Sequence, residues 1–464
     1  MTDASTGDQQ DLSLQLDWSS YQDAGMGDAY ADIPKYGGNY AKAIAACINS
    51  RQCEAAGKQV MCPSYRVSND PNLSTGGRVR LLKAALSTSQ DSVSLLTPEL
   101  EAAMDLCVSC KGCKRECESN VDMPLIKAEY LAQKYATQQR GWRSRLFAHL
   151  PQLLHQYPWL GKLIAWRNKS AFVRQLVDPA LKLNSSVNLP QPRITPIATP
   201  ASKNLTVTDA PVGTGVKVAL FVDTFTRQFE PQVARAAIKL LTQAGYRVRM
   251  LEPENSEESA YCCGRTWLAQ GMIPQAKQQA QRLVNGILSL VDDGYTIVGL
   301  EASCVLGLRD DAQALGLEPD VARAAKNTFL LEEFLARETK SGNLKLAFRI
   351  PKSPSLIHGH CHQKATGAMK SVRRVMKLIP DHKFEFIDAS CCGMAGSFGL
   401  EAEHAQYSRS MAEQGLLPAL ENRQTQAVIA NGFSCRQQIR NHSDAKPMHL
   451  VEWLALNMDS GTSK

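Results

Sequence analysis

The sequence predicts an α+β protein in which a helical, cysteine-rich N-terminal domain precedes two repeated α/β modules. Three observations lead to this prediction. Seven of the fourteen cysteines lie between positions 47 and 117. A Cys-Cys-Gly (CCG) triplet occurs at 262–264 and again at 391–393. Each triplet lies in a segment that alternates β-branched strands with amphipathic helices, a pattern typical of a small, largely parallel sheet.

Composition places the chain among ordinary soluble globular proteins. Its 464 residues are 44% hydrophobic and 21% charged, enough for two or three domains with proper cores. The sequence contains no run of eighteen apolar residues that could span a bilayer. The formal charge of +7 is not accompanied by any nucleic-acid-binding motif, so we expect no nucleic-acid partner.

Residues 1–38 form an acidic arm with poor apolar periodicity. This segment contains seven aspartates and only one basic residue, Lys35. This composition predicts an extended or disordered segment, either a solvated tail or an arm that wraps a partner.

The first ten residues lack the basic start and apolar core of a secretory signal. We therefore expect a cytoplasmic protein, in which fourteen cysteines serve as metal ligands rather than as disulfides.

Residues 39–137 are predicted to be helices joined by cysteine-bearing loops. Helical patterns precede position 47, cover 76–86, run from Thr97 to Cys107, and resume after Cys117. The second run reads C-x2-C-x2-C-x3-C, the spacing of a ferredoxin with two iron–sulfur clusters. In that pattern the fourth cysteine of each run binds the cluster of the other run. The predicted ligands are Cys107, Cys110, Cys113 and Cys62 for cluster one, and Cys47, Cys53 and Cys117 for cluster two.

The first run departs from the pattern at its middle position, where Ser50 replaces a cysteine. Cluster two is thus one thiolate short, and we expect either a [3Fe-4S] cluster or a [4Fe-4S] cluster with Ser50, water or another side chain on the open iron. Cluster one is expected to be [4Fe-4S]. Zinc is the alternative for Cys107 to Cys117, although zinc prefers four ligands in two pairs.

Residues 138–183 combine basic residues with Trp, Tyr and Leu at helical spacing. Such basic amphipathic helices lie in a membrane interface or pack as ordinary docking helices with a solvated basic face, and the sequence leaves both readings open. Residues 184–215 are rich in Pro, Thr and Ser and are predicted to be a linker.

Residues 216–345 and 346–464 repeat one pattern of strands, helices and cysteines. Strand 216–225 corresponds to 354–361, and the strand before Cys304 corresponds to the strand before Cys435. Gly264 and Gly393 free the backbone to turn both neighbouring sulfurs inward. The second module has a full set of candidate metal ligands: Cys361, Cys391, Cys392 and Cys435, with His358, His360 and His362 as added imidazole ligands or proton donors.

The first module has fewer candidate metal ligands than the second. It offers Cys262, Cys263 and Cys304, and Thr224 stands at the position of Cys361. We expect a third cluster or metal in the second module. The first module holds a weaker metal site or is a degenerate repeat kept as a scaffold.

The order of these segments resembles the iron–sulfur subunits of glycolate oxidase and of anaerobic glycerol-3-phosphate dehydrogenase. It is also similar to the B and D subunits of heterodisulfide reductase. The closest resemblance is to the iron–sulfur half of FAD-linked D-lactate and D-2-hydroxyglutarate dehydrogenases, through the MCPSYR segment (61–66) and VDTFTRQFEP (222–231). The resemblance covers residues 35–457.

The resemblance implies a flavoprotein partner that carries FAD, oxidises a 2-hydroxy acid, and passes electrons one at a time to the clusters and on to a membrane quinone. It would place the protein in the cytoplasm, with peripheral contact at the inner face of the cell membrane. Besides Ser50, the chain departs from the related patterns at Glu118, where proline is usual, and at Gly307 and Gln438, where a C-x2-C ending is absent.

The chain has no flavin-binding G-x-G-x-x-G between a strand and a helix. We therefore expect an oxidoreductase subunit that transfers electrons for a flavin-dependent 2-hydroxyacid dehydrogenase. The alternative is a reductase whose CCG modules act directly on a disulfide or quinone at an open metal site. A metal-stabilised scaffold without turnover is the third reading.

Overall fold

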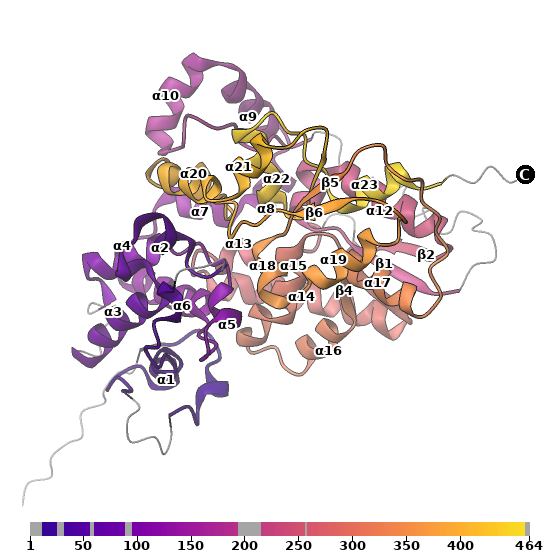
Figure 1. The fold of residues 1–464 in the computed structure, drawn as a ribbon. Coiled ribbons are helices and arrows are strands. Elements are labelled where there is room, and N and C mark those ends of the chain that lie inside the picture. The colour runs from indigo at the N-terminus through magenta and orange to yellow at the C-terminus, as the bar shows by residue number, and fades with distance from the viewer. Residues whose placement is uncertain are drawn as a thin grey trace, which may run out of the picture.

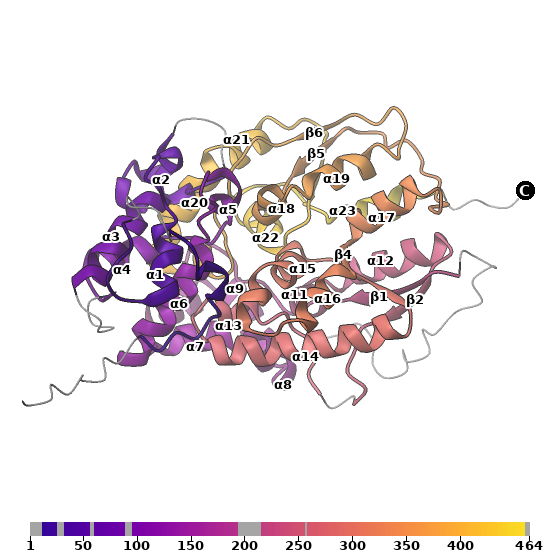
Figure 2. The ribbon, with the colours of Figure 1, turned by 90° about the horizontal axis from the view of Figure 1, so that it is seen from below.

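The computed structural model describes residues 12–25, 32–55, 60–88, 95–193, 215–255 and 258–459. The N-terminal helices gather at one end of the molecule, and the two sheets lie side by side at the other (Figure 1). The same division appears in the view turned by 90° (Figure 2). The α+β class with two repeated α/β modules is confirmed.

Residues 12–25, in the predicted acidic arm, pack against the N-terminal domain. Leu12, Leu16 and Trp18 are buried, and the 3-10 helix η1 (Ser19–Tyr21) follows them. The buried carboxylate of Glu129 accepts hydrogen bonds from the Leu16 amide at 2.9 Å and from Trp18 Nε1 at 3.2 Å. A solvated tail is therefore wrong for these residues, because three apolar side chains and one carboxylate anchor them. The arm's remaining residues before 12 and at 26–31 lie outside the described part.

The N-terminal domain consists of short helices separated by cysteine loops. They are α1 (Gly38–Ala45), η2 (Gln52–Glu54), α2 (Pro63–Ser68), η3 (Pro71–Leu73), α3 (Thr75–Thr88), α4 (Pro98–Asp105), α5 (Gly112–Glu116) and α6 (Met123–Thr137). The predicted N-cap is present, since the Thr97 side chain accepts a hydrogen bond from the Leu100 amide.

Four short helices cover residues 142–181. They are α7 (Trp142–Ala148), α8 (Leu150–Gln156), α9 (Leu160–Lys169) and α10 (Ala171–Leu181). The chain then runs along the second module, where the Asn184 amide donates to the Leu400 carbonyl at 2.8 Å. Val187 is buried in the core of that module. The described part of the predicted linker, residues 184–193, is thus packed on its neighbour.

The first CCG module contains a four-stranded parallel sheet in the order β2-β1-β3-β4. Its elements are β1 (Lys217–Phe221), α11 (Thr224–Phe229), α12 (Pro231–Gln243), β2 (Arg247–Met250), α13 (Arg265–Leu268), α14 (Ile273–Asp292), β3 (Tyr295–Gly299), α15 (Ala302–Arg309), η6 (Asp311–Leu315), α16 (Asp320–Lys326), β4 (Thr328–Leu330) and α17 (Leu331–Lys340).

The second CCG module contains a three-stranded parallel sheet in the order β6-β5-β7. Its elements are β5 (Ser355–His358), α18 (Cys361–Thr366), α19 (Met369–Met376), β6 (Phe384–Phe386), η7 (Phe398–Leu400), η8 (Ala402–His404), α20 (Ala405–Glu413), α21 (Leu416–Glu421), β7 (Ala427–Ala430), α22 (Phe433–His442) and α23 (Leu450–Asn457).

The repeat predicted from the sequence is also a structural repeat. β1 pairs Phe221 with Gly299, and β5 pairs His358 with Ala430 at the same step of the register. Both strands end there, and both are followed by a helix that begins three residues later, α11 in one module and α18 in the other. Residues of the two modules can therefore be compared position by position.

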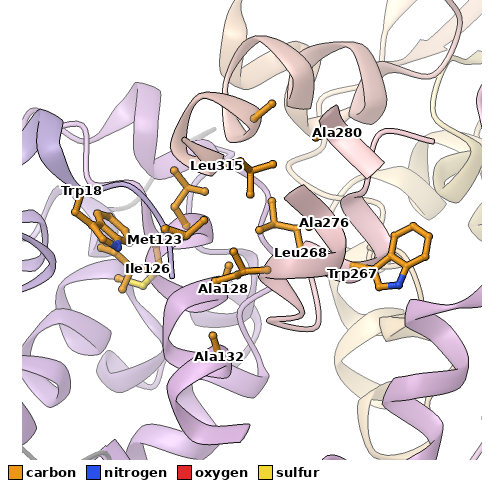
Figure 3. Close-up of a cluster of buried hydrophobic side chains, with 14 of the residues drawn as sticks. Trp18, Met123, Ile126, Ala128, Ala132, Trp267, Leu268, Ala276, Ala280 and Leu315 are labelled. Carbon is orange, nitrogen blue, oxygen red and sulfur yellow. The ribbon is translucent and has the colours of Figure 1, made fainter. Parts of the chain in front are cut away.

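One hydrophobic core joins the N-terminal domain to the first CCG module. In Figure 3, Ala128 of α6 lies beside Leu268 of the first module, whereas Ile126 lies on the side of Trp18. A second core runs from β1 and β3 into β5, β7 and α23 and so joins the two CCG modules. The three parts thus share continuous buried surfaces.

Helices of the described residues are too short, or too polar, to traverse a lipid bilayer.

Candidate metal centres

The four thiols predicted for cluster one lie together inside the N-terminal domain. Burial, followed by the neighbouring thiols Cys110, Cys62 and Cys107 and the Asp122 carboxylate, raises the pKa of Cys113 well above its ordinary value. Burial also raises the pKa of Cys62 to about 11. Without a cation the thiols of Cys62 and Cys113 are protonated at neutral pH. A metal that binds them would displace the protons and hold the sulfurs as thiolates.

The residues predicted for cluster two line a separate cavity nearer the surface. Cys47, Cys53 and Cys117 face a space of about 330 Å³, including its mouth, and Ser50 and Ser119 line the same space. Ile48 on its rim is 66% exposed. The structure therefore brings Ser50 to the three thiols, as the sequence pattern predicts, and also places a second hydroxyl there.

The two cysteine turns have the same backbone conformation at their centres. Asn49 and Arg51 adopt the left-handed conformation on either side of Ser50, with φ of 57° each. Ser109 and Lys111 do the same on either side of Cys110, with φ of 49° and 61°. Left-handed backbone is costly for residues other than glycine and persists where the surroundings require it. Ser50 thus stands at the conformational equivalent of Cys110.

Backbone amides already point at the sulfurs in both sites. The Thr75 amide lies 3.0 Å from Cys62 Sγ, and the Gly76 amide lies 3.2 Å from Cys53 Sγ. Both donors belong to the first turn of α3, whose amides have no partner within the helix. Such donors stabilise negative charge on sulfur, so this geometry suits thiolate ligands of a cluster.

The second CCG module gathers its four cysteines around one buried point. The Cys391 thiol beside it, together with burial, raises the pKa of Cys361. Cys391 is next to Cys392, and Sγ of Cys392, Sγ of Cys435 and a ring nitrogen of His358 all lie within 4.8 Å of one another. Gly393 allows this approach, because its φ is +86° and a Cβ there would lie 2.0 Å from the Ser408 carbonyl oxygen.

The first CCG module gathers three thiols. Sγ of Cys263 and Sγ of Cys304 lie 3.0 Å apart, and the Cys263 thiol and burial raise the pKa of Cys262. Gly264 repeats the role of Gly393: its φ is +78°, and a Cβ would lie 2.7 Å from the Ala276 carbonyl oxygen. The Thr224 hydroxyl approaches Cys262 from the start of α11. A hollow of about 340 Å³, including its mouth, lies beside Cys262 and is lined also by Trp267, Thr224 and residues of α8.

The three predicted histidines have different surroundings. His360 Nδ1 accepts a hydrogen bond from the His362 amide and caps α18. His362 Nε2 lies 3.1 Å from the Ser109 carbonyl oxygen and 3.1 Å from Arg265 Nη2. Both ring nitrogens of His358 are buried without a hydrogen-bond partner among the described residues. Burial lowers the pKa of all three imidazoles, and it is the neutral imidazole that can bind a metal.

A series of charged side chains connects the cysteine turn around Lys111, at the site of cluster one, to both CCG modules. Lys111, between Cys110 and Cys113, is buried, and its Nζ lies 2.5 Å from Asp310 Oδ2 and 2.5 Å from Asp311 Oδ1 of the first module. Asp311 Oδ2 accepts a hydrogen bond from Arg265 Nη1 at 2.6 Å.

Arg265 in turn contacts His362, next to Cys361 of the second module. In the same helix as His362, the Lys364 carbonyl accepts a hydrogen bond from Arg115 of α5 at 2.9 Å. Helix α5 and helix α18 therefore lie against each other. The thiols of Cys110 and Cys361 are close enough that charge on Cys361 raises the pKa of Cys110. The thiols of cluster one and of the second module share one buried region.

Sequence reasoning missed Lys111, Arg265, Asp310 and Asp311. A basic residue within two positions of a candidate ligand is the signal that could have found two of them, since Lys111 follows Cys110 and Arg265 lies two residues after Cys263. Their acidic partners lie almost 200 residues away from Lys111 along the chain, and the sequence offers no marker for that pairing.

Comparison with known families agrees with the geometry. Residues 43–121 match the 4Fe-4S dicluster domain, and residues 219–309 and 356–440 each match the cysteine-rich domain. The chain therefore carries a 4Fe-4S dicluster domain followed by two cysteine-rich domains, which confirms the expected resemblance.

Three proteins are similar to this chain in sequence. D-2-hydroxyglutarate dehydrogenase of Pseudomonas putida is 25% identical over 442 residues, which cover 84% of this chain and 41% of that protein. The C subunit of anaerobic glycerol-3-phosphate dehydrogenase of Escherichia coli is 25% identical over 288 residues, 61% of this chain and 69% of that protein. Lactate utilization protein A of Bacillus subtilis is 23% identical over 251 residues, 52% of this chain and 99% of that protein.

The chain thus spans less than half the length of the first of these relatives. No solved structure matches it. The iron–sulfur and cysteine-rich domains, together with these relatives, support a role in electron transfer.

Proposed function

We propose that this chain is the iron–sulfur electron-transfer subunit of a flavin-dependent 2-hydroxyacid dehydrogenase, and that it relays electrons from the FAD of a partner protein to quinone. The observation that carries the proposal is the contact between α5 and α18, which buries the thiols of cluster one beside those of the second CCG module. Electron transfer needs closely spaced centres, and a structural metal site needs no such neighbour.

The proposed ligands follow the thiol groups described above. They are Cys62, Cys107, Cys110 and Cys113 for cluster one; Cys47, Cys53 and Cys117, with Ser50 beside the open iron, for cluster two; Cys361, Cys391, Cys392 and Cys435 in the second CCG module; and, as a weaker site, Cys262, Cys263 and Cys304 in the first. When bound, iron–sulfur clusters accept and release one electron at a time.

The surroundings of the two N-terminal sites suit different positions in a relay. The site of Cys47, Cys53 and Cys117 opens at the surface beside the exposed Ile48 and Ser50, where a flavoprotein could approach. The site of Cys110 and its partners lies in the interior, against helix α18 of the second CCG module. We therefore propose that electrons arrive at cluster two and leave through cluster one toward the CCG modules.

Helices α7–α10 support contact with a membrane, where a quinone acceptor would be found. Eight of the eleven large apolar side chains that are exposed among the described residues lie between positions 142 and 176: Trp142, Leu146, Tyr157, Trp159, Leu163, Trp166, Phe172 and Leu176. Lys162, Lys169 and Arg145 lie among them. Aromatic and basic residues on one surface are typical of helices in a lipid interface.

Not all the basic residues of this segment are free to meet lipid. Arg167 is buried and forms a two-fold ion pair with Asp178, with contacts of 2.9 and 2.7 Å. Arg143 pairs with Glu401 and Glu403 of the second module. The expectation of a uniformly solvated basic face is wrong for these two residues, because each holds the segment to the rest of the fold.

The chemistry of the substrate is proposed from the relatives. One is named a D-2-hydroxyglutarate dehydrogenase and another a lactate utilization protein, and both names point to 2-hydroxy acids. In this proposal the pocket for the hydroxy acid belongs to the flavoprotein, since the chain shows no flavin-binding motif.

The test is reconstitution with a candidate flavoprotein. Anaerobically purified chain is mixed with the flavoprotein and a 2-hydroxy acid, and reduction of a quinone analogue is followed by absorbance. We expect hydroxy-acid-dependent reduction that requires both proteins and is lost in Cys110→Ser. Reduction by the flavoprotein alone at the same rate would contradict the proposal.

One observation favours a second candidate function. The hollow beside Cys262, with the Cys263 and Cys304 thiols behind it, offers room for a small substrate next to redox-active sulfur. In this alternative the CCG modules reduce a disulfide or quinone directly at an open metal site. Turnover of a disulfide by the isolated chain with an artificial electron donor, and without any flavoprotein, would favour it.

A further inference from the structure

We propose that His358 is a fifth ligand of the second CCG site, and binds iron together with Cys361, Cys391, Cys392 and Cys435. The inference deepens the proposed function and depends on it in one respect, namely that an iron–sulfur group occupies this module. It distinguishes His358 from the two histidines that follow it in the sequence.

The first argument is the state of the His358 ring. His358 ends β5, the central strand of its sheet, and is 1% exposed. Neither ring nitrogen has a hydrogen-bond partner among the described residues. A buried polar group without a partner is destabilising, so such groups generally meet a metal, an ion or water. One of these nitrogens lies within 4.8 Å of the sulfurs of Cys392 and Cys435.

The second argument is that the other two histidines are already engaged. His360 caps α18 through Nδ1, and His362 contacts Ser109 and Arg265 through Nε2. His358 alone of the three has both nitrogens unpartnered beside the thiols.

The third argument comes from the internal repeat. The position of His358 in β5 is occupied by Phe221 in β1, and the position of Cys361 in α18 is occupied by Thr224 in α11. The module that lacks the equivalent cysteine thus also lacks the equivalent imidazole. Loss of both donors from one repeat is the pattern expected if the two residues serve one metal group.

The number of donors indicates what kind of group this is. Four thiolates and one imidazole exceed the four ligands of a tetrahedral zinc ion. They fit a group with more than one iron, in which one iron carries a neutral imidazole at a position where a cysteine would add another anionic thiolate. Histidine ligation of this kind raises the reduction potential of an iron–sulfur centre. His358 would therefore make the second CCG site a better electron acceptor than the same site with a thiolate at position 358.

The first measurement establishes whether the site is filled. Iron and acid-labile sulfide are counted in anaerobically purified full-length protein and in Cys435→Ser. We expect the variant to lose the iron and sulfide of one centre. Unchanged counts, or zinc in place of iron, would overturn both this inference and the proposed cluster in the second module.

The second measurement tests the imidazole itself. Protein labelled with 15N-histidine is poised at successive potentials and examined by pulsed electron paramagnetic resonance. We expect the hyperfine coupling of a nitrogen bound directly to iron, lost in His358→Ala. The coupling should be retained in His360→Asn, a matched control that keeps a side-chain acceptor for the N-cap of α18.

A further variant separates ligation from a loss of folding. His358→Cys supplies a thiolate at the same place, so we expect its iron content to match the wild type and the midpoint potential of the second-module centre to become more negative. If Cys435→Ser loses a centre but no nitrogen coupling exists, or if the potential is the same in His358→Cys, His358 is not a ligand. In that case the proposed electron relay would still stand.

Discussion

Ser50 shows how a single side chain can define a cluster site. It lies between two left-handed residues, as Cys110 does, and it lines the cavity of Cys47, Cys53 and Cys117. A hydroxyl is a far weaker ligand for iron than a thiolate. The site can therefore hold a cluster with an open or missing iron corner while its backbone is already shaped for a fourth cysteine.

Ser50→Cys should complete this ligand set. We expect the electron paramagnetic resonance signal of a three-iron or open-site cluster to be replaced by that of an ordinary four-iron cluster, with about one more iron per chain where the wild type holds three. Ser119→Cys is the matched control, because Ser119 lines the same cavity but has a left-handed residue, Asn120, on one side only. A Ser50→Cys spectrum identical to that of the wild type would show that position 50 does not face the cluster.

His404 is a second residue whose chemistry can be tested alone. Its Nε2 lies 2.7 Å from Asp105 Oδ2 and so links the second CCG module to α4. Burial opposes the charged imidazole, but the hydrogen bonds and charges of Asp105 and Glu401 outweigh it and raise the pKa of His404 to about 9. Because the folded-state pKa exceeds the unfolded value of about 6.5, the stabilisation is complete below pH 6.5 and is lost as the pH rises through 9.

His404→Gln should therefore destabilise the protein more at pH 6 than at pH 10. The shift of about 2.5 pKa units sets a ceiling of roughly 3 kcal/mol. We expect about 1–2 kcal/mol, because the Asp105 side chain is 58% exposed and solvent screens the pair. Anaerobic urea unfolding at the two pH values measures the difference. Asp105→Asn should also remove much of the difference in unfolding free energy between pH 6 and pH 10. If His404→Gln loses the same stability at both pH values, the ion pair with Asp105 is not the cause of the loss.

At the scale of elements, the sequence predicted what is local or periodic and missed what joins distant segments. The helices around the cysteines, the Thr97 cap, the parallel sheets and the repeat of the two modules follow from spacing and periodicity, and the structure contains them. The packing of Leu16 and Trp18 on α6 was missed, because aspartates dominate the composition of that arm. The burial of Arg167 was also missed, since a basic residue on an amphipathic helix is more often solvated.

Helices α9 and α10 carry an element-scale prediction. Trp159, Leu163 and Trp166 are spaced to share one side of α9, and Phe172 on α10 is 69% exposed. The double substitution Trp166→Glu with Phe172→Glu should weaken binding to anionic lipid vesicles by about tenfold or more, since withdrawing each aromatic ring from the interface costs on the order of 1 kcal/mol or more. Co-sedimentation with vesicles measures the change.

Ile350→Glu with Leu456→Glu is the matched control for this experiment. Both residues are exposed and apolar, at 58% and 63%, but lie outside the 142–176 segment. Equal loss of binding in the two double variants would show that the effect comes from net charge alone. Wild-type protein that does not bind vesicles at all would refute the membrane contact.

At the scale of the whole molecule, the cysteine sites lie within the cores that hold the parts together. Cys53, Cys62 and Cys113 belong to the same buried cluster as residues of α6 and of the first CCG module. Metal loss would leave buried thiols in place of bonded thiolates and would weaken that shared core.

Removal of iron should therefore lower the melting temperature of the whole chain. We expect a decrease of about 2 °C or more, as follows from a loss of at least ~2 kcal/mol in a protein of this size. Circular dichroism of anaerobic protein before and after chelation measures it. Reconstitution with iron and sulfide should restore the original transition, and a melting temperature that does not respond to iron would mean that the thiols are not ligands in the folded state.

The burial of the Lys111 turn has a consequence for biosynthesis. Asp310 and Asp311 of the first module and His362 of the second module contact this turn. A carrier that delivers a preformed cluster to the proposed ligands Cys107, Cys110 and Cys113 would have to reach them before those modules dock. Translation provides this interval, because the N-terminal domain leaves the ribosome before the residues that will enclose it have been made.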